Sequence, residues 1–164
     1  MVFGSKDLTR LIGIGPNYLN RFIEREQFRI ASSVRGGLGR GSQRLFSIDD
    51  VYGIALVWWL FESGLRALMI QRVLDDICGQ RVFGRGSANE AAKRLLSFEA
   101  EALLIQRRPR IAAYAVKQER TPQNVELLKG PDVFEQMRDG TGPSTILLRV
   151  GELFSDLKQA MNTQ

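Results

Sequence analysis

The sequence predicts an α+β protein with a helical N-terminal part and a smaller C-terminal part of three or four strands. Three observations lead to this prediction. Apolar residues near the N-terminus recur three and four positions apart, a glycine-rich segment separates them from two further helices, and several short β-compatible runs follow in the second half. We expect domains at 1–78 and 88–164, joined by a linker over 79–87.

Composition excludes several classes of function. The chain has 164 residues, 44% of them apolar, which is enough for a packed core. It lacks histidine, and Cys78 is its one cysteine, so no internal disulfide can form and the commonest general base and metal ligand is missing. The carboxylates do not fall in a motif for acid–base catalysis. We expect no enzyme, no cofactor and no metal site.

The N-terminal residues and the hydropathy pattern indicate where in the cell the protein is expected. No run of apolar residues is long enough to cross a membrane. Charged residues interrupt the first ten positions, unlike the layout of a signal peptide. We therefore expect no membrane association and a cytoplasmic location.

Two short helices are predicted in the first 30 residues. We expect Ser5 to cap the first helix, residues 13–15 (Gly-Ile-Gly) to end it, and Pro16 to open the second. Each helix has its own apolar stripe: Leu8, Leu11 and Ile12 in the first, and Leu19, Phe22 and Ile23 in the second. Two helices joined by a tight corner form a helix-turn-helix pattern, whose second helix enters the major groove of DNA.

The polar face of the second helix carries residues suited to reading bases. Asparagine and arginine form bidentate hydrogen bonds with adenine and guanine. We expect four side chains to reach base edges: Asn17, Tyr18, Asn20 and Arg21.

Positive charge is concentrated in the same part of the chain. Residues 1–46 hold eight Lys or Arg against three acids, whereas residues 47–164 hold fifteen of each. Residues 31–46 combine four glycines with three arginines, which predicts a flexible β-hairpin, or wing, that follows phosphates or enters a minor groove. A solvated surface loop and a nucleotide-phosphate cradle are the alternatives, although no Gly-Lys-Ser/Thr ending supports the cradle. We expect phosphate contacts from Arg25, Arg35, Arg40 and Arg44.

Two further helices follow the wing. Ser47 is expected to cap a helix that is apolar on more than one face and must be covered on more than one side. A second helix over 65–77 carries an apolar stripe of Leu68, Met69, Val73 and Ile77. Trp58 and Trp59 either line a ligand pocket or partner surface, or pack, one in the N-terminal core and one against the C-terminal part. We favour packing.

The order of these elements resembles a known family. The residues that carry the resemblance are the 13–15 corner, Leu19 and Phe22, the run 44–50 (Arg-Leu-Phe-Ser-Ile-Asp-Asp), and 62–65 with Ile70 and Leu74. Residues 3–78 are similar to the winged-helix domain of the MerR (mercury-resistance regulator) superfamily, which includes related folds in phage excisionases. The resemblance implies that residues 17–25 lie in a major groove, that the wing over 34–44 touches backbone or minor groove, and that the turn near Arg66 meets a phosphate.

The chain departs from that family in three respects. The recognition helix has Asn20-Arg21-Phe22 where the family usually has an Arg-Tyr-Tyr type sequence. The long C-terminal coiled coil through which typical members dimerise has no counterpart, and the metal-sensing cysteines are missing. Thiolate metal sensing is therefore not expected.

The second half is predicted as a small α+β unit for dimerisation or sensing, and it resembles no family. We expect helices at 88–96, 131–138 and 151–161. Strands are expected at 102–107, 111–117, 124–128 and 145–150, the first two paired as a hairpin around 108–110.

Two hypotheses of function follow. The first is a sequence-specific DNA-binding protein, a MerR-like transcriptional regulator that binds double-stranded DNA as a homodimer, with an effector or protein partner at the C-terminal part; an excisionase-like architectural protein is a variant of it. The second is a protein-interaction adaptor that binds nucleic acid without sequence preference. Loss of base preference on mutating Asn20 and Arg21 would separate them.

Overall fold

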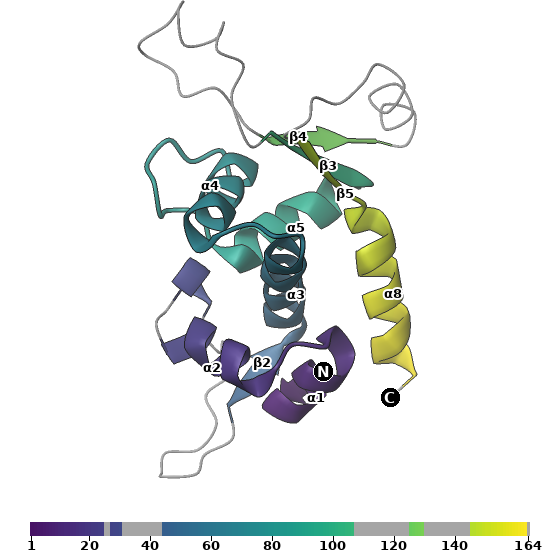
Figure 1. Cartoon of the computed structure of the whole chain (residues 1–164). Helices are drawn as coiled ribbons and strands as arrows, with labels where there is room; N and C mark the ends of the chain where they lie inside the picture. The colour runs from purple at the N-terminus through teal and green to yellow at the C-terminus, as the bar shows by residue number, and fades with distance from the viewer. Residues whose placement is uncertain (25–26, 31–43, 107–124, 130–144, 164) are drawn as a thin grey trace, which may run out of the picture.

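The structure, a computed structural model, describes residues 1–24, 27–30, 44–106, 125–129 and 145–163. This part of the chain is α+β, as predicted, with six α-helices, one 3₁₀ helix and two small antiparallel sheets. Figure 1 shows helix α3 at the centre, with the other helices around it and the sheets at opposite ends. The elements in chain order are β1 Val2–Gly4, α1 Ser5–Ile12, α2 Pro16–Glu24, η1 Gln27–Arg29, β2 Leu45–Ser47, α3 Ile48–Glu62, α4 Ala67–Ile77, α5 Ala88–Ser97, β3 Ala102–Gln106, β4 Val125–Leu128, β5 Thr145–Leu148 and α8 Val150–Asn162.

The first helix begins differently from the prediction. Its N-cap is Gly4, not Ser5, and the Gly4 N–H donates to the Asp7 carboxylate at 2.8 Å. The reason is β1, an unpredicted strand that ends at Gly4, so that Ser5 is already helical. The predicted corner is confirmed: Gly13 adopts a left-handed backbone (φ 75°), and its N–H donates to the Thr9 carbonyl at 3.0 Å.

Strands β1 and β2 form the smaller sheet and join the N-terminus to residues 45–47. They are antiparallel, with Val2 opposite Ser47 and Phe3 opposite Phe46. Both phenylalanine side chains are buried. The chain thus leaves the predicted wing through a strand fixed to the core. Residues 34–43 of that wing lie outside the described residues.

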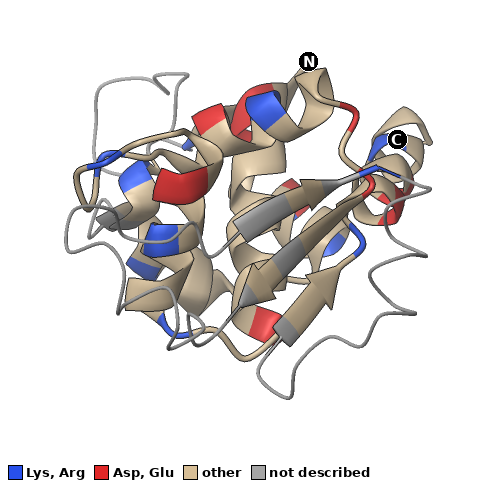
Figure 2. Cartoon of the chain, turned by 90° about the horizontal axis from the view of Figure 1, so that it is seen from above, with Lys and Arg blue, Asp and Glu red and all other residues tan. Residues whose placement is uncertain are grey.

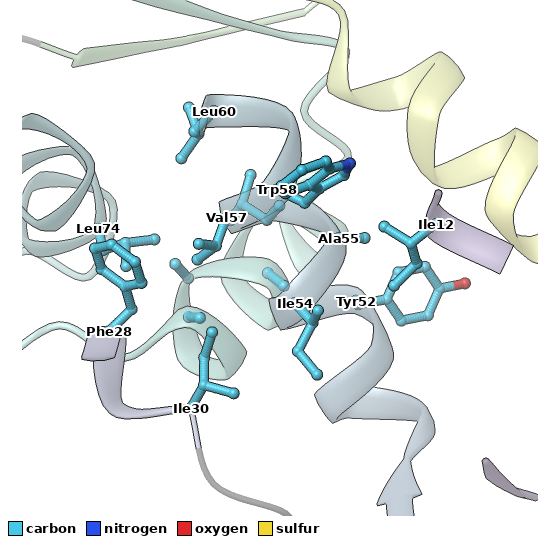
Figure 3. Close-up of a cluster of buried hydrophobic side chains, with 14 of the residues drawn as sticks. Ile12, Phe28, Ile30, Tyr52, Ile54, Ala55, Val57, Trp58, Leu60 and Leu74 are labelled. Atoms are coloured by element: carbon cyan, nitrogen blue, oxygen red, sulfur yellow. The ribbon is translucent and has the colours of Figure 1, made fainter. Parts of the chain in front are cut away.

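The predicted cap of α3 is confirmed. The Asp50 N–H donates to Ser47 Oγ, while the Asp50 carboxylate accepts hydrogen bonds from the Ser47 N–H (2.7 Å) and hydroxyl (2.9 Å). Nearly every residue from Val51 to Leu60 is buried, so the prediction that α3 is covered on several sides also holds. Figure 3 shows Tyr52 of α3 beside Ile12, with Phe28 and Leu74 on the opposite side.

Helix α4 departs from the prediction in its start and in its stripe. It begins at Ala67, with Arg66 as the N-cap residue, instead of at residue 65. Leu68, predicted on the apolar stripe, is 69% exposed. The side that faces the core consists of Ile70, Val73, Leu74 and Ile77.

Helix α5 packs directly on α3. A Cβ atom added at Gly53 would clash with the Asn89 side-chain oxygen and lie 2.9 Å from the Asn89 backbone nitrogen, which shows how closely the two helices approach. Asn89 Nδ2 donates to the Asp50 carboxylate at 2.7 Å. One hydrophobic cluster contains residues of α1, α3, α5, β3 and α8. The core is therefore continuous across residues 79–87, and the division into two domains stays a prediction.

The second sheet has the order β4-β3-β5 and is antiparallel throughout, with Leu103 of β3 opposite both Leu127 and Leu148. The predicted strands near 102, 124 and 145 and the helices at 88 and 151 are confirmed, with shifted ends: Val150 opens α8 instead of closing the strand. The strand predicted at 111–117 and the helix at 131–138 lie outside the described residues.

Candidate nucleic-acid interface

Helix α2 has one buried and one exposed side, as its sequence pattern predicted. Leu19 and Phe22 are 1% and 4% exposed and pack into the core. On the other side Asn17, Asn20 and Arg21 are exposed. The structure thus brings three of the four predicted base-reading side chains together on one open surface.

The corner before α2 holds that surface in a fixed orientation. Ile14 is completely buried, and the Gly15 carbonyl accepts hydrogen bonds from the N–H groups of Tyr18 (3.0 Å) and Leu19 (3.1 Å). Pro16 occupies the first position of the helix, where its missing N–H costs nothing. The direction of α2 relative to α1 is therefore set by packing and by backbone hydrogen bonds.

Tyr18, the fourth predicted base-reading residue, has a different environment. Its ring centroid lies 5.3 Å from those of Trp58 and Phe61, both on α3. The Trp58 and Phe61 rings are themselves stacked at 5.6 Å. The Tyr18 residue is 40% exposed. The Tyr18 ring packs α2 against α3. Tyr18 therefore helps to position α2, and only part of its side chain is accessible to a ligand.

The two tryptophans pack as favoured from the sequence. Trp58 is 7% exposed within the N-terminal aromatic cluster. Trp59 lies 5.5 Å from Phe154 of α8, between ring centroids. Trp59 therefore contributes to the contact with the C-terminal part.

The segment after α2 is strained and tied to a distant loop. Phe28 and Arg29 have positive φ angles of 61° and 53°, a conformation that costs a residue other than glycine about 1–2 kcal/mol. Phe28 is held by burial and by an edge-to-face contact with Phe22, with centroids 5.6 Å apart. Arg29 Nη1 donates to the Arg85 carbonyl at 3.1 Å. Arg85 therefore lies within reach of η1, the short helix that follows the predicted recognition helix in the chain.

The remaining predicted site residues are only partly placed. Arg66 is exposed at the start of α4, where the resemblance put a phosphate contact, and Arg44 is half-buried just before β2. Arg25, Arg35 and Arg40 lie outside the described residues.

Positive charge is exposed on the same side of the molecule. Arg21 on α2, Arg29 on η1, and Arg81 and Arg85 after α4 are exposed, and none forms an ion pair with another residue of the described segments. By contrast, Lys93 on α5 pairs with Asp49 at 2.8 Å, and Arg149 pairs with Glu152 at 2.6 Å. Figure 2 shows several Lys and Arg residues on the left, the side on which Figure 1 labels α4, and others on the right near the C-terminus. Sequence reasoning counted Arg29 as charge but did not place it at the site; its contact with Arg85 has no local sequence signal.

Across the described segments, no group of three or more His, Cys, Asp or Glu side chains is arranged to hold a metal ion. None of the helices in the described part is long and apolar enough to cross a membrane. No family model matches the chain, and no curated protein matches it either. Function is therefore inferred from the site.

Proposed function

We propose that this protein is a sequence-specific DNA-binding protein with a MerR-like winged helix-turn-helix, acting as a transcriptional regulator. The observation that carries the proposal is the surface of α2. Asn17, Asn20 and Arg21 are exposed together on a helix whose opposite side is buried and whose start is fixed by a rigid corner. These side chains are the types that read adenine and guanine.

The β1–β2 sheet supports the same proposal. It fixes residues 45–47, through which the predicted wing returns to the core, against the N-terminal strand. Arginine and glycine in residues 34–44 suit contact with phosphates or a minor groove. In this proposal α2 specifies sequence, while Arg25, Arg35, Arg40, Arg44 and Arg66 hold the backbone.

We further propose that the protein binds as a homodimer on two half-sites. One winged helix covers too little DNA for high specificity, and a two-fold dimer reads two sites about one helical turn apart. The C-terminal part would supply the dimer contact or bind an effector.

Selection from a randomised duplex library tests base readout. Wild-type protein is expected to recover a motif of two spaced half-sites near physiological salt. The Asn20→Ala/Arg21→Ala variant should lose base preference, at about 1–3 kcal/mol for each bidentate contact removed. Lys158→Ala/Gln159→Ala on α8 is the matched control, because it also removes an adjacent cation and amide from an exposed helix face. It should recover the wild-type motif.

The alternatives give distinct outcomes. Salt-sensitive binding without any motif would contradict the regulator and favour an adaptor that binds nucleic acid through charge alone. A motif accompanied by strong bending of the duplex would favour the excisionase-like architectural variant. A motif that is unchanged in Asn20→Ala/Arg21→Ala would contradict the assignment of α2 as the recognition helix.

A further inference from the structure

Residues 79–86 form a loop that α4 holds in one conformation. The Asp75 carboxylate, in the last turn of α4, is 5% exposed and accepts hydrogen bonds from the N–H groups of Gly84 (2.9 Å) and Gly86 (2.6 Å). Gln71 Nε2 donates to the same carboxylate at 3.0 Å and to the Gly86 carbonyl at 2.9 Å. The loop predicted as a linker is therefore fixed at its far end by a buried acid.

The close fit of Gly86 shows how tightly this anchor is packed. A Cβ atom at Gly86 would lie 2.7 Å from the Leu74 carbonyl oxygen, a distance that real Cβ atoms do not tolerate. A buried carboxylate at a helix C-terminus is unfavourable, because the helix dipole is negative there. Its three hydrogen bonds offset that cost and hold the loop.

The anchored loop presents basic and apolar side chains to solvent. Arg81 and Arg85 are exposed, and between them Val82 and Phe83 are 61% and 54% exposed. A loop with no fixed structure would be free to fold such apolar side chains away. Holding them outward, between two cations, is typical of a surface that another molecule covers.

The loop adjoins the proposed DNA-binding surface. Arg29 donates to the Arg85 carbonyl, and Arg29 follows α2 and precedes the predicted wing. Figure 1 shows α2 and the loop after α4 on the same side of the central helix α3. DNA that is bound along α2 would therefore extend toward this loop.

We propose that residues 81–85 are a second DNA-contact element, in which Arg81 and Arg85 bind phosphates flanking the site read by α2 and Phe83 lies against the sugars. The inference rests on the proposed function. Charge favours DNA over a second copy of this chain, because residues 79–87 hold two arginines and no acid. The N–H groups of Gly84 and Gly86 are occupied by Asp75, so the arginine side chains must bind the phosphates.

The salt dependence of binding tests this element in the full-length protein. Removing one phosphate contact lowers the slope of log affinity against log salt by about 0.9. Arg81→Ala/Arg85→Ala should lower the magnitude of this slope by about 1.8. The loss of affinity relative to wild type should therefore become about tenfold smaller between about 50 and about 200 mM salt. The probe is a labelled duplex carrying the selected motif or, if none is recovered, a mixed-sequence duplex.

Two further variants sharpen the result. Arg149→Ala/Lys158→Ala removes the same charge from the α8 side, where Arg149 only pairs with the exposed Glu152, and should keep the wild-type slope. Phe83→Ala should lower affinity by the same factor at every salt concentration, because it releases no counterion. The selected motif should be unchanged in all of them, since phosphate contacts carry no direct sequence information.

The outcomes separate this inference from the proposed function. The wild-type protein could recover a motif while Arg81→Ala/Arg85→Ala keeps the wild-type slope of log affinity against log salt. That result would overturn the second contact and leave the proposed function standing. Equal slope changes in the loop variant and the α8 control would also overturn it, as a general charge effect. Lowered slope in the loop variant without any recovered motif would support the loop contact while contradicting sequence-specific readout. Failure of the wild type to bind duplex would overturn both.

Discussion

Cys78 lies just after α4 as a buried thiol that its surroundings keep protonated. The residue is 7% exposed, and its Sγ donates weakly to the Ser87 carbonyl at 3.8 Å. Burial, together with the negative charge of Glu90, raises the pKa of the Cys78 thiol to about 11. Since the thiolate is the reactive form of cysteine, Cys78 acts as a packing residue at neutral pH.

This shifted pKa predicts a loss of stability at alkaline pH. The unfolded thiol ionises near its ordinary value of 9.0, whereas the folded thiol stays neutral until about pH 11. The contribution of the neutral Cys78 thiol to the stability of the folded protein is therefore complete below pH 9. It declines as pH rises toward 11, by at most about 1.4 kcal/mol per pH unit. The test is urea unfolding of wild type and Cys78→Ala between pH 9 and pH 11. The free energy of unfolding of wild type should exceed that of the variant by less and less as the pH rises. A constant difference would contradict the prediction.

The contact between α3 and α5 depends on polar groups as well as on apolar packing. The Asp50 carboxylate receives hydrogen bonds from Ser47, at the end of β2, and from Asn89 on α5. Lys93 of α5 pairs with Asp49 next to it at 2.8 Å. The start of α3, which follows directly from β2, is therefore fastened to the C-terminal half of the chain.

Gly53 is the residue that allows this contact. Inside an exposed helix, alanine would be better than glycine by about 1 kcal/mol. Here the added methyl group would meet the backbone and side chain of Asn89. Gly53→Ala should therefore destabilise the protein by about 1–3 kcal/mol, measured by thermal or urea unfolding.

Gly15→Ala is the control for that measurement. A Cβ atom at Gly15 has its nearest neighbour at 3.6 Å, an ordinary contact with the Tyr18 ring. Its stability should stay close to that of wild type. If Gly53→Ala were as stable as Gly15→Ala, the close approach of α3 and α5 would be wrong.

Across the whole molecule, α3 is shared by both halves of the chain. Its residues pack against α1 on one side and against α5 and α8 on others, and the aromatic rings of Tyr52 and Trp59 both contact Phe154. Removing the second half would uncover the apolar face of α3 on which α5 packs, and would take away the buried α5 residues Ala88, Ala91 and Leu95. The N-terminal part depends on this cover.

A fragment of residues 1–78 should therefore fail to form a stable native state, despite containing the whole predicted winged-helix unit. We expect it to lack a cooperative thermal transition by far-UV circular dichroism. Full-length protein should unfold in one transition that coincides when followed by circular dichroism and by fluorescence of Trp58 and Trp59. A cooperative transition in the fragment would show instead that residues 1–78 are an independent domain.

Local patterns in the sequence were sufficient for much of the N-terminal half. The 13–15 corner, the Ser47 cap and the two sides of α2 all follow from residues within a few positions of one another. Such signals are reliable because helix caps and apolar periodicity act over one or two turns. The exposure of Asn17, Asn20 and Arg21 was predictable for that reason, whereas their role in base readout stays a prediction.

Contacts between distant residues required the tertiary structure. Strand β1 has three residues, too few for a periodic pattern, and exists through its pairing with β2. Leu68 occupies an apolar helix position that is not covered by any element among the described residues, and it is 69% exposed. The Tyr18 ring was expected on the open face and instead packs on α3.

The sequence by itself determined that residues 16–24, 48–62 and 88–97 are helical, where α1 ends, how α3 is capped, and which side of α2 faces solvent. Only the tertiary structure decided what covers α3, that Asp75 anchors residues 79–86, and that this loop adjoins Arg29. The physical reason is that periodicity identifies an apolar or polar face but carries no information about its partner. That choice depends on the packing of segments far apart in the chain, such as Gly53 against Asn89.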